Sequence, residues 1–204
     1  MRSAIFAVGL AGAVAALPVL AQAPPAPPIN IRGTVEKLDG DTLTVKSREG
    51  QDVSVMLAAN VPVSGTVQRS LADIKAGDYI ASTSLKAVDG KLHALEIHIF
   101  SEAQKKIVPQ LQVPYDLAPQ SIMTNAIVEG VSAAPQGELL KLTFKDQQTE
   151  LVVPPGTPVV AAVPGDRGLL KPGAAVYISA RKQPDGMIAA IRITAEKDGV
   201  KPPM

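Results

Sequence analysis

The second half of this chain repeats the first at a constant offset of 96 residues, without gaps. Residues that coincide at this offset include Ile31 and Ile127, Val35 and Val131, Leu43 and Leu139, Asp89-Gly90 and Asp185-Gly186, and Ile97 and Ile193. Because the coincidences cover both turn and core positions, the sequence predicts two copies of one fold. We place these modules at residues 30–100 and 126–196.

Each module has the turn residues and the short apolar segments that are typical of a β protein. The strands expected in the first module cover 31–38, 42–47, 52–57, 78–86 and 91–100, and the second module follows the same pattern over 126–153, 174–182 and 187–195. Turn pairs such as Asp39-Gly40 and Asp89-Gly90 supply the positive φ that tight hairpins require. Apolar residues alternate along the strands, as in Leu43 and Val45, which indicates one buried face.

A single helical turn is expected between the third and fourth strands. Ser70 stands at the N-cap position with Asp73 at the capping-box distance, Leu71 and Ile74 face inward, and Gly77 ends the turn. Five strands with this insertion predict an all-β protein of two tandem, five-stranded barrels of the oligonucleotide/oligosaccharide-binding (OB) Greek-key type. A related small barrel of another topology would give nearly the same pattern.

The N-terminus has the form of a secretory signal. A positive charge at Arg2 precedes an apolar run and small residues, so we predict a signal peptide over 1–21 with cleavage after Ala21 in preference to Ala23. The apolar run is too short to span a bilayer comfortably, so no membrane span is expected after cleavage. The protein is therefore expected to be periplasmic or secreted.

Three further segments complete the predicted organisation. A proline-rich spacer covers 22–29, a connector with scattered prolines covers 101–125, and a flexible polar tail covers 197–204. The chain contains no cysteine, so the packed cores alone must stabilise an exported protein.

Charge and aromatic content weigh against nucleic-acid binding. The formal net charge is only +1 and aromatic residues make up 3% of the chain. A nucleic-acid binder usually combines a basic excess with aromatic stacking platforms, so no nucleic-acid partner is expected.

A search for chemistry leaves one weak metal candidate. Glu96 and His98 are two residues apart in the last strand of the first module and share a face, whereas His93 points to the other side. The second module has Arg192 and Thr194 at the two positions, so a solvated outer face is the favoured interpretation and a metal site at Glu96 and His98 the alternative. No catalytic constellation and no cofactor motif is present, so an enzyme is not expected.

The motifs of both modules resemble a family of exported bacterial domains of unknown function. The resemblance rests on Gly33-Thr34-Val35, 40–45, 71–78 and 89–94, and the connector segment 114–119 resembles that of two-copy periplasmic members. The resemblance implies small barrels and no particular chemistry. Some relatives are labelled as permeases of metal transporters. We expect a non-enzymatic binding module whose partner is a protein or an envelope component, with metal or small-solute handling beside a transporter as the alternative; the oligomeric state is left open.

Overall fold

The protein consists of two β-barrels stacked along its long axis. The computed structural model describes residues 27–203, so the predicted signal peptide (1–21) and most of the predicted spacer lie outside the described residues. Strands dominate this part of the chain, and its helices are limited to the short segments Leu71–Asp73 (η1), Glu102–Lys105 (α1) and Arg167–Leu169 (η2). The all-β prediction is confirmed. No helix within 27–203 is long and apolar enough to cross a membrane.

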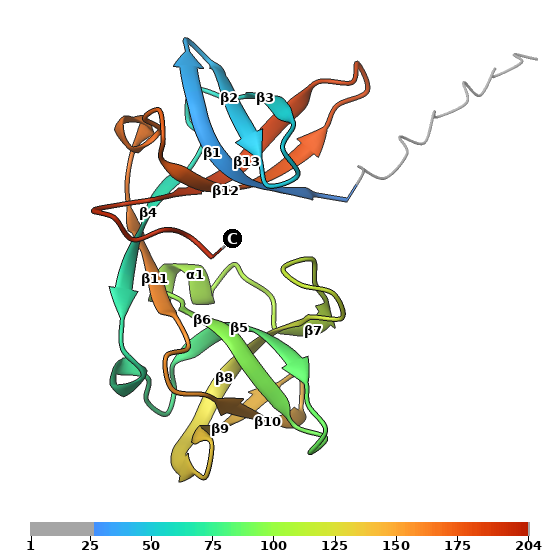
Figure 1. Ribbon diagram of the computed structural model, residues 1–204, viewed down its shortest axis with the longest axis vertical. Coiled ribbons are helices and arrows are strands. Elements are labelled where there is room, and N and C mark those ends of the chain that lie inside the picture. Colours follow the sequence, from blue (N-terminus) through green and yellow to red (C-terminus); the bar gives the residue numbers. More distant parts are fainter. Residues whose placement is uncertain (1–26, 204) are drawn as a thin grey trace, which may run out of the picture.

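Five strands form the upper barrel of Figure 1. They are β1 (Ile29–Asp39), β2 (Thr42–Ser47), β3 (Asp52–Met56), β12 (Ala175–Lys182) and β13 (Ile188–Ala195). Neighbours pair in the order β3-β2-β1-β12-β13, and a parallel bridge between Ala189 and Met56 closes the circuit. Closure removes exposed sheet edges on either side of this barrel.

The lower barrel has the same construction. Its strands are β5 (Tyr79–Lys86), β6 (Leu92–Ile99), β8 (Ile122–Ala134), β9 (Gly137–Phe144) and β10 (Gln147–Val153). They pair in the order β10-β9-β8-β5-β6, and a parallel contact between β6 and β10 closes the circuit.

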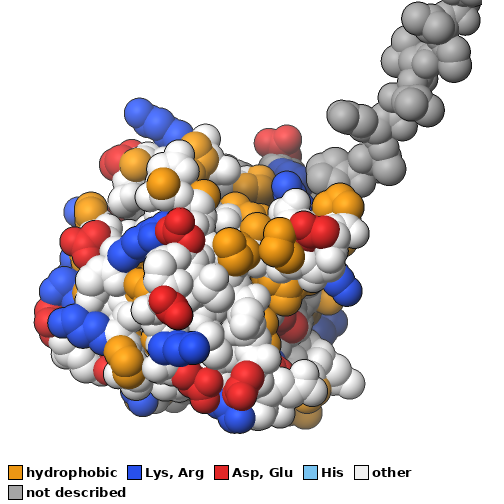
Figure 2. Space-filling view, turned by 90° about the horizontal axis from the view of Figure 1, so that it is seen from above, with side chains coloured by type: hydrophobic (Ala, Val, Ile, Leu, Met, Phe, Trp, Pro, Cys, Tyr) orange, Lys and Arg blue, Asp and Glu red, His pale blue; other side chains and the backbone are white. Residues whose placement is uncertain are grey.

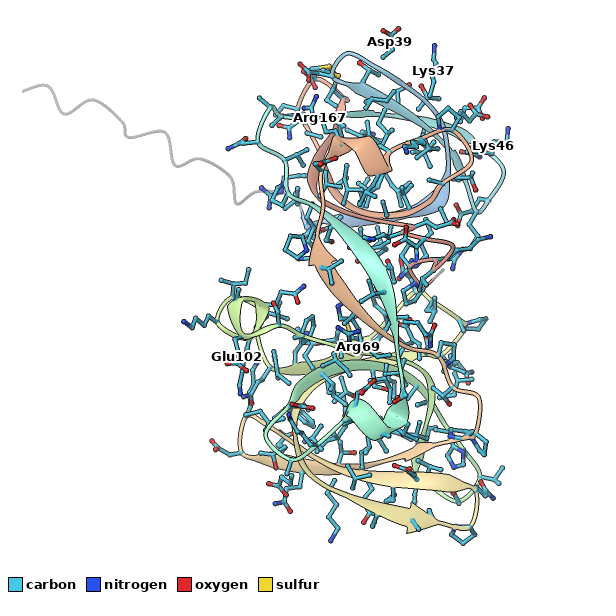
Figure 3. The ribbon with its side chains drawn as sticks, turned by 90° about the vertical axis from the view of Figure 1, so that its left-hand side faces the viewer. Lys37, Asp39, Lys46, Arg69, Glu102 and Arg167 are labelled. Atoms are coloured by element: carbon cyan, nitrogen blue, oxygen red, sulfur yellow. The ribbon has the colours of Figure 1, made fainter. Side chains whose placement is uncertain are left out.

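Two strands cross between the barrels and pair with each other. β4 (Val63–Arg69) leads down from the upper barrel and β11 (Val159–Pro164) leads up from the lower one, so that they form an antiparallel ladder (Figures 1 and 3). Thr66 pairs with Ala162, its own counterpart at the offset of 96. An approximate two-fold axis therefore passes through the centre of this ladder.

The crossing strands mean that the two sequence modules exchange their last two strands. Each barrel combines the first three strands of one module with the last two strands of the other, and so does its core. The upper core contains Ile31, Val35, Leu43, Val45, Val55, Leu57, Val63, Leu170, Val176, Ile178, Ala180, Ile193 and Ala195. The lower core contains Ile74, Ile80, Leu92, Ala94, Ile97, Ala126, Val128, Leu140, Leu142, Phe144, Leu151, Val153 and Val159.

This arrangement differs from the finer sequence prediction. Two barrels in tandem, one from each module, are not confirmed, because neither core is built from one module. The ranges 30–100 and 126–196 therefore mark the sequence repeats, whereas the packed units combine both. The physical reason lies in β4 and β11, which are not among the strands expected from the sequence and which carry the chain out of one barrel into the other.

The ungapped repeat is wrong within the first hairpin of each module. Val35 and Val128 are the equivalent core positions, since each side chain is about 1% exposed. The Val35 N–H donates to the Ala174 carbonyl and the Val128 N–H to the Asp78 carbonyl, and these two acceptors are counterparts at the offset of 96. Val131, the counterpart suggested by the sequence, is 39% exposed. The β8–β9 hairpin is longer than the β1–β2 hairpin, so equivalent residues fall out of step there.

Local predictions agree with the structure. The Ser70 backbone N–H donates to the Asp73 carboxylate at 2.7 Å, which forms half of the expected capping box, and Ile74 is buried beneath the turn. Gly90 and Gly186 both adopt positive φ in the hairpins that precede β6 and β13. The flexibility expected of the tail over 197–204 stays a prediction. Its residues 197–203 return between the barrels, where Pro202 is buried (Figure 1).

Mutation of one core should destabilise both barrels. Ile178 is fully buried in the upper core, and Ile178→Ala should cost about 2–5 kcal/mol through lost burial and a residual cavity. Because each module spans both cores, unfolding should remain one transition, and the slowest-exchanging amides of both barrels should lose equal protection in hydrogen exchange.

Ile191→Ala is the matched control, since Ile191 is 38% exposed, and it should stay within about 0.5 kcal/mol of the wild type. Wild-type protection in β8 to β10 of the Ile178→Ala variant would contradict the shared-core interpretation.

Candidate functional site

A groove of about 430 Å³ lies on the outer side of the lower barrel. Strands β8, β9 and β10 form its floor, and the turn between β5 and β6 forms one wall. It is lined by Gly90, Lys91, Leu92, Glu129, Lys141, Leu142, Gln148, Thr149 and Glu150. The groove is predominantly polar, so it is suited to a ligand that forms hydrogen bonds.

A β-bulge places Glu129 at the groove. The pairing of β8 with β9 shifts register between Val128 and Gly130, which leaves Glu129 without a partner in the ladder. Thr143 donates to the Glu129 carboxylate, and the Gln148 amide donates to it at 3.2 Å. Bulges often redirect a side chain next to a binding site, and here the bulge adds a held carboxylate to the groove.

The other charges of the groove compensate each other. Lys91 Nζ donates to a Glu150 carboxylate oxygen at 2.7 Å, and Lys141 stands opposite Glu150 in the β9–β10 ladder. The hydrogen bond from Lys91 holds the pKa of Glu150 below its usual value, with a smaller contribution from Lys141. Two lysines face two glutamates, so the groove carries no formal net charge.

The corresponding face of the upper barrel has different chemistry. Met187 occupies the place of Lys91, and the facing pair Thr44 and Ser54 replaces Lys141 and Glu150. The duplicated scaffold thus presents a face with two lysines and two glutamates on one barrel and a face without either lysine on the other.

A buried arginine fastens the connector to the upper barrel. The Arg32 side chain is sandwiched between Tyr115 and Tyr177, with its guanidinium carbon 5.1 Å from each ring centroid. Its Nη2 contacts the Asp116 carboxylate at 3.0 Å. Partial burial alone would raise the pKa of Asp116, but the hydrogen bond and charge of Arg32 hold that pKa below its usual value. Arg32 is only 4% exposed, so the contact serves the structure and is closed to a large ligand.

The predicted metal candidates Glu96 and His98 lie between the two barrels. Both are on the face of β6 that points away from the lower core, as the sequence indicated. Thr83 donates to Glu96 Oε1 at 2.7 Å, and the His98 ring packs against Phe100 with centroids 5.2 Å apart. The predicted opposite orientation of His93 is wrong: β6 has a bulge at Leu95, so that Leu92, Ala94 and Ile97 face the core and His93 lies on the same outer face as Glu96 and His98. His93 contacts Asp89 at 2.9 Å. No group of three or more His, Cys, Asp or Glu side chains within 27–203 is placed to hold a metal ion.

Burial disfavours the charged forms of both candidates. It raises the pKa of the Glu96 carboxyl, against the opposing effects of the Thr83 hydrogen bond and the attraction of Arg32. It lowers the pKa of His98 from 6.5 to about 4, with the positive charge of Arg192 adding to the effect. Glu96 Oε2 and His98 Nε2 are both inaccessible to solvent and lack a protein partner, as does Asn125 Oδ1. The space between the barrels is therefore a polar seam with unused hydrogen-bonding capacity.

Sequence reasoning missed the residues of the groove. Lys91 lies in the β5–β6 turn of the first module, whereas Glu129 and Lys141 lie on β8 and β9 of the second. They meet only because the modules exchange strands. A signal for Glu129 did exist, since Glu36 and Glu129 follow the equivalent core residues Val35 and Val128. The shifted alignment of the first hairpins concealed it.

Fold and geometry define an all-β protein with two closed barrels and a polar groove on one of them. No protein-family model matches the chain, and no solved structure shows significant similarity to it. Cell wall mannoprotein 1 of Aspergillus flavus is 33% identical over 93 residues, which is 46% of this chain. The chain spans 34% of the length of that mannoprotein, so the similarity does not define a family for it.

Acidification should weaken the fold through His98. Its pKa is lower in the folded state than in the unfolded chain, so the unfolded chain binds more protons between about pH 4 and 6.5. The contribution to stability is full above pH 6.5 and falls toward pH 4, by an amount on the order of 2–3 kcal/mol. Urea unfolding in metal-free buffer across this range measures it.

The raised pKa of Glu96 acts in the opposite direction, so the difference between wild type and His98→Asn isolates the histidine. The variant should lose much of the slope between pH 4 and 6.5, whereas the control His93→Asn should retain it because His98 is still present. Equal slopes in wild type and His98→Asn would refute this assignment.

Proposed function

We propose that the protein is an exported, non-enzymatic binding module that holds a neutral, hydroxyl-rich component of the cell envelope, such as a glycan, in the groove of the lower barrel. The observation that carries the proposal is the groove itself, in which two lysines balance two glutamates and polar side chains donate and accept hydrogen bonds.

The strand order supports an OB-type assignment for each barrel. Counting the strands of one barrel as 1 to 5, the pairing runs 1-2-3-5-4-1 with strands 3 and 5 parallel. OB barrels bind oligonucleotides and oligosaccharides on strands 2 and 3 and on the loops beside them. In the lower barrel these elements are β9, β10 and the β5–β6 turn, which line the groove.

The lining favours a saccharide over a nucleic acid. None of the nine lining residues is aromatic, so bases would find no stacking platform, and two glutamates would repel phosphates. Seen from above, over the upper barrel and away from the groove, the molecular face also has charges of both signs interspersed (Figure 2). A sugar hydroxyl both donates and accepts, and so it can bridge a lysine and a glutamate that already compensate each other.

Export and the absence of catalysis are parts of the same proposal. The predicted signal peptide supports a periplasmic or secreted location, and the one relative described above carries the name of a cell wall protein. Each groove carboxylate is engaged, Glu129 by Thr143 and Gln148 and Glu150 by Lys91. These contacts suit hydrogen bonding to a ligand better than proton transfer.

Removal of two groove side chains should weaken glycan binding. Lys141→Ala combined with Gln148→Ala removes two donors, and the Kd for a bound oligosaccharide should rise at least about tenfold. Calorimetry with oligomers of mannose, glucose and N-acetylglucosamine provides the measurement. Thr44→Ala, at the position of Lys141 in the upper barrel, is the matched control and should bind as the wild type does. Failure of every oligomer to bind below about 10 mM would overturn the proposal.

A second candidate function is metal or small-solute handling beside a transporter. It is favoured by the unpartnered atoms Glu96 Oε2 and His98 Nε2 on one face of β6. Two neighbouring arginines, Arg32 and Arg192, weigh against a cation at this place.

Calorimetric titration with zinc, copper and nickel separates this candidate from glycan binding. A real site should bind one of these ions tighter than about 1 mM and lose it in His98→Ala, while His93→Ala keeps it. The same heat signal in wild type and His98→Ala would eliminate Glu96 and His98 as the ligands.

A further inference from the structure

The two halves of the chain are joined almost entirely by non-covalent contacts. Residues 27–108 form the N-terminal half and 109–203 the C-terminal half. Strand pairs between the halves are β1–β12, β3–β13, β4–β13, β4–β11, β5–β8, β6–β10 and β6–β11. Each barrel is complete only when it contains strands from both halves.

Side chains reinforce the same pairing. Arg167 of the C-terminal half forms an ion pair with Asp41 at 2.6 Å and donates to the carbonyls of Leu57 and Ala58 in the N-terminal half. Two further ion pairs cross between the halves, Lys91 to Glu150 at 2.7 Å in the lower barrel and Arg32 to Asp116 at 3.0 Å. None of these contacts requires that both halves belong to one molecule.

The covalent link between the halves is confined to a short hinge. Up to Val108 the connector contacts the N-terminal half, since Lys105 donates to the Gly77 carbonyl and Tyr79 donates to the Val108 carbonyl. From Pro109 onward it contacts the C-terminal half, since Asn125 donates to the Pro109 carbonyl and β7 (Leu111–Pro114) pairs with β8. A change of backbone direction at Val108–Pro109 would therefore separate the halves without breaking contacts within either one.

We propose that a second copy of this chain is a partner, and that two copies exchange their C-terminal halves at this hinge. Each body of the dimer would contain 27–108 of one copy and 109–203 of the other, with both barrels complete. Contacts such as Arg32 to Asp116 would be formed between chains at the same positions. Domain exchange has a low cost when only a hinge changes, and Pro109 biases Val108 toward the extended conformation that an open hinge needs.

Concentration decides between the closed monomer and the exchanged dimer. A short connector holds its own halves together at an effective concentration on the order of millimolar, so a dilute chain closes on itself. Chains that fold close to one another should form the dimer, and it should then persist because separation requires opening both barrels. This inference does not depend on what the groove binds.

A cysteine pair across the β4–β11 ladder tests the exchange in the full chain, which has no cysteine of its own. Thr66 and Ala162 face each other in antiparallel register, and such neighbours lie within the range a disulfide spans. Thr66→Cys/Ala162→Cys is refolded under oxidising conditions at about 1 µM and at about 1 mM, then examined by denaturing electrophoresis without reductant.

The matched control is Thr44→Cys/Ser54→Cys, a facing pair within the N-terminal half. Exchange predicts a disulfide-linked dimer that increases with concentration in the first variant only, while the control runs as a monomer on the gel and elutes as a dimer from a native sizing column at high concentration. A monomeric disulfide product at both concentrations, or equal linkage between chains in both variants, would overturn the proposal.

Discussion

The rest of the structure depends on the antiparallel ladder of β4 and β11. Each strand leaves the barrel that its module began and enters the other, so the ladder obliges the modules to share both cores. The pairing of Thr66 with Ala162 places equivalent positions at its centre, and the contacts on either side repeat accordingly. The N–H of Ile97 bonds to the Pro158 carbonyl and that of Ile193 to the Pro62 carbonyl, each at 2.9 Å. The duplication is thus a two-fold arrangement held together by backbone hydrogen bonds.

Where the barrels meet, the molecule is polar. Arg32 contacts Asp116 and two tyrosine rings, but its Nε has no hydrogen-bond partner, and Glu96 and His98 likewise keep one unpartnered atom each. A buried polar seam adds less stability than an apolar one, and it makes the association of the barrels sensitive to charge. The connector contributes Tyr115 and Asp116 to this seam, so it also participates in holding the barrels together.

The sharing of strands between the two modules within one chain also explains how one scaffold can hold two different surfaces. The cores share apolar side chains at equivalent places such as Val35 and Val128, but the outer faces differ, as Lys91 against Met187 and Glu150 against Ser54 show. Since Lys91 and Glu150 come from different modules, the groove of the lower barrel exists only because that barrel combines strands of both modules. Binding and fold are therefore linked in this protein more closely than in a chain of independent domains.

The sequence by itself determined the class of the fold, most strand positions, the capped turn after Ser70 and the shared face of Glu96 and His98. These features follow from local turn chemistry and from alternation within one strand. Tertiary structure alone decided which module completes which barrel, because Val63 to Arg69 has the same strand propensity whether it folds back or crosses over. It also decided the groove, whose charged residues are far apart in sequence, and the equivalence of Val35 with Val128, which a longer hairpin had displaced.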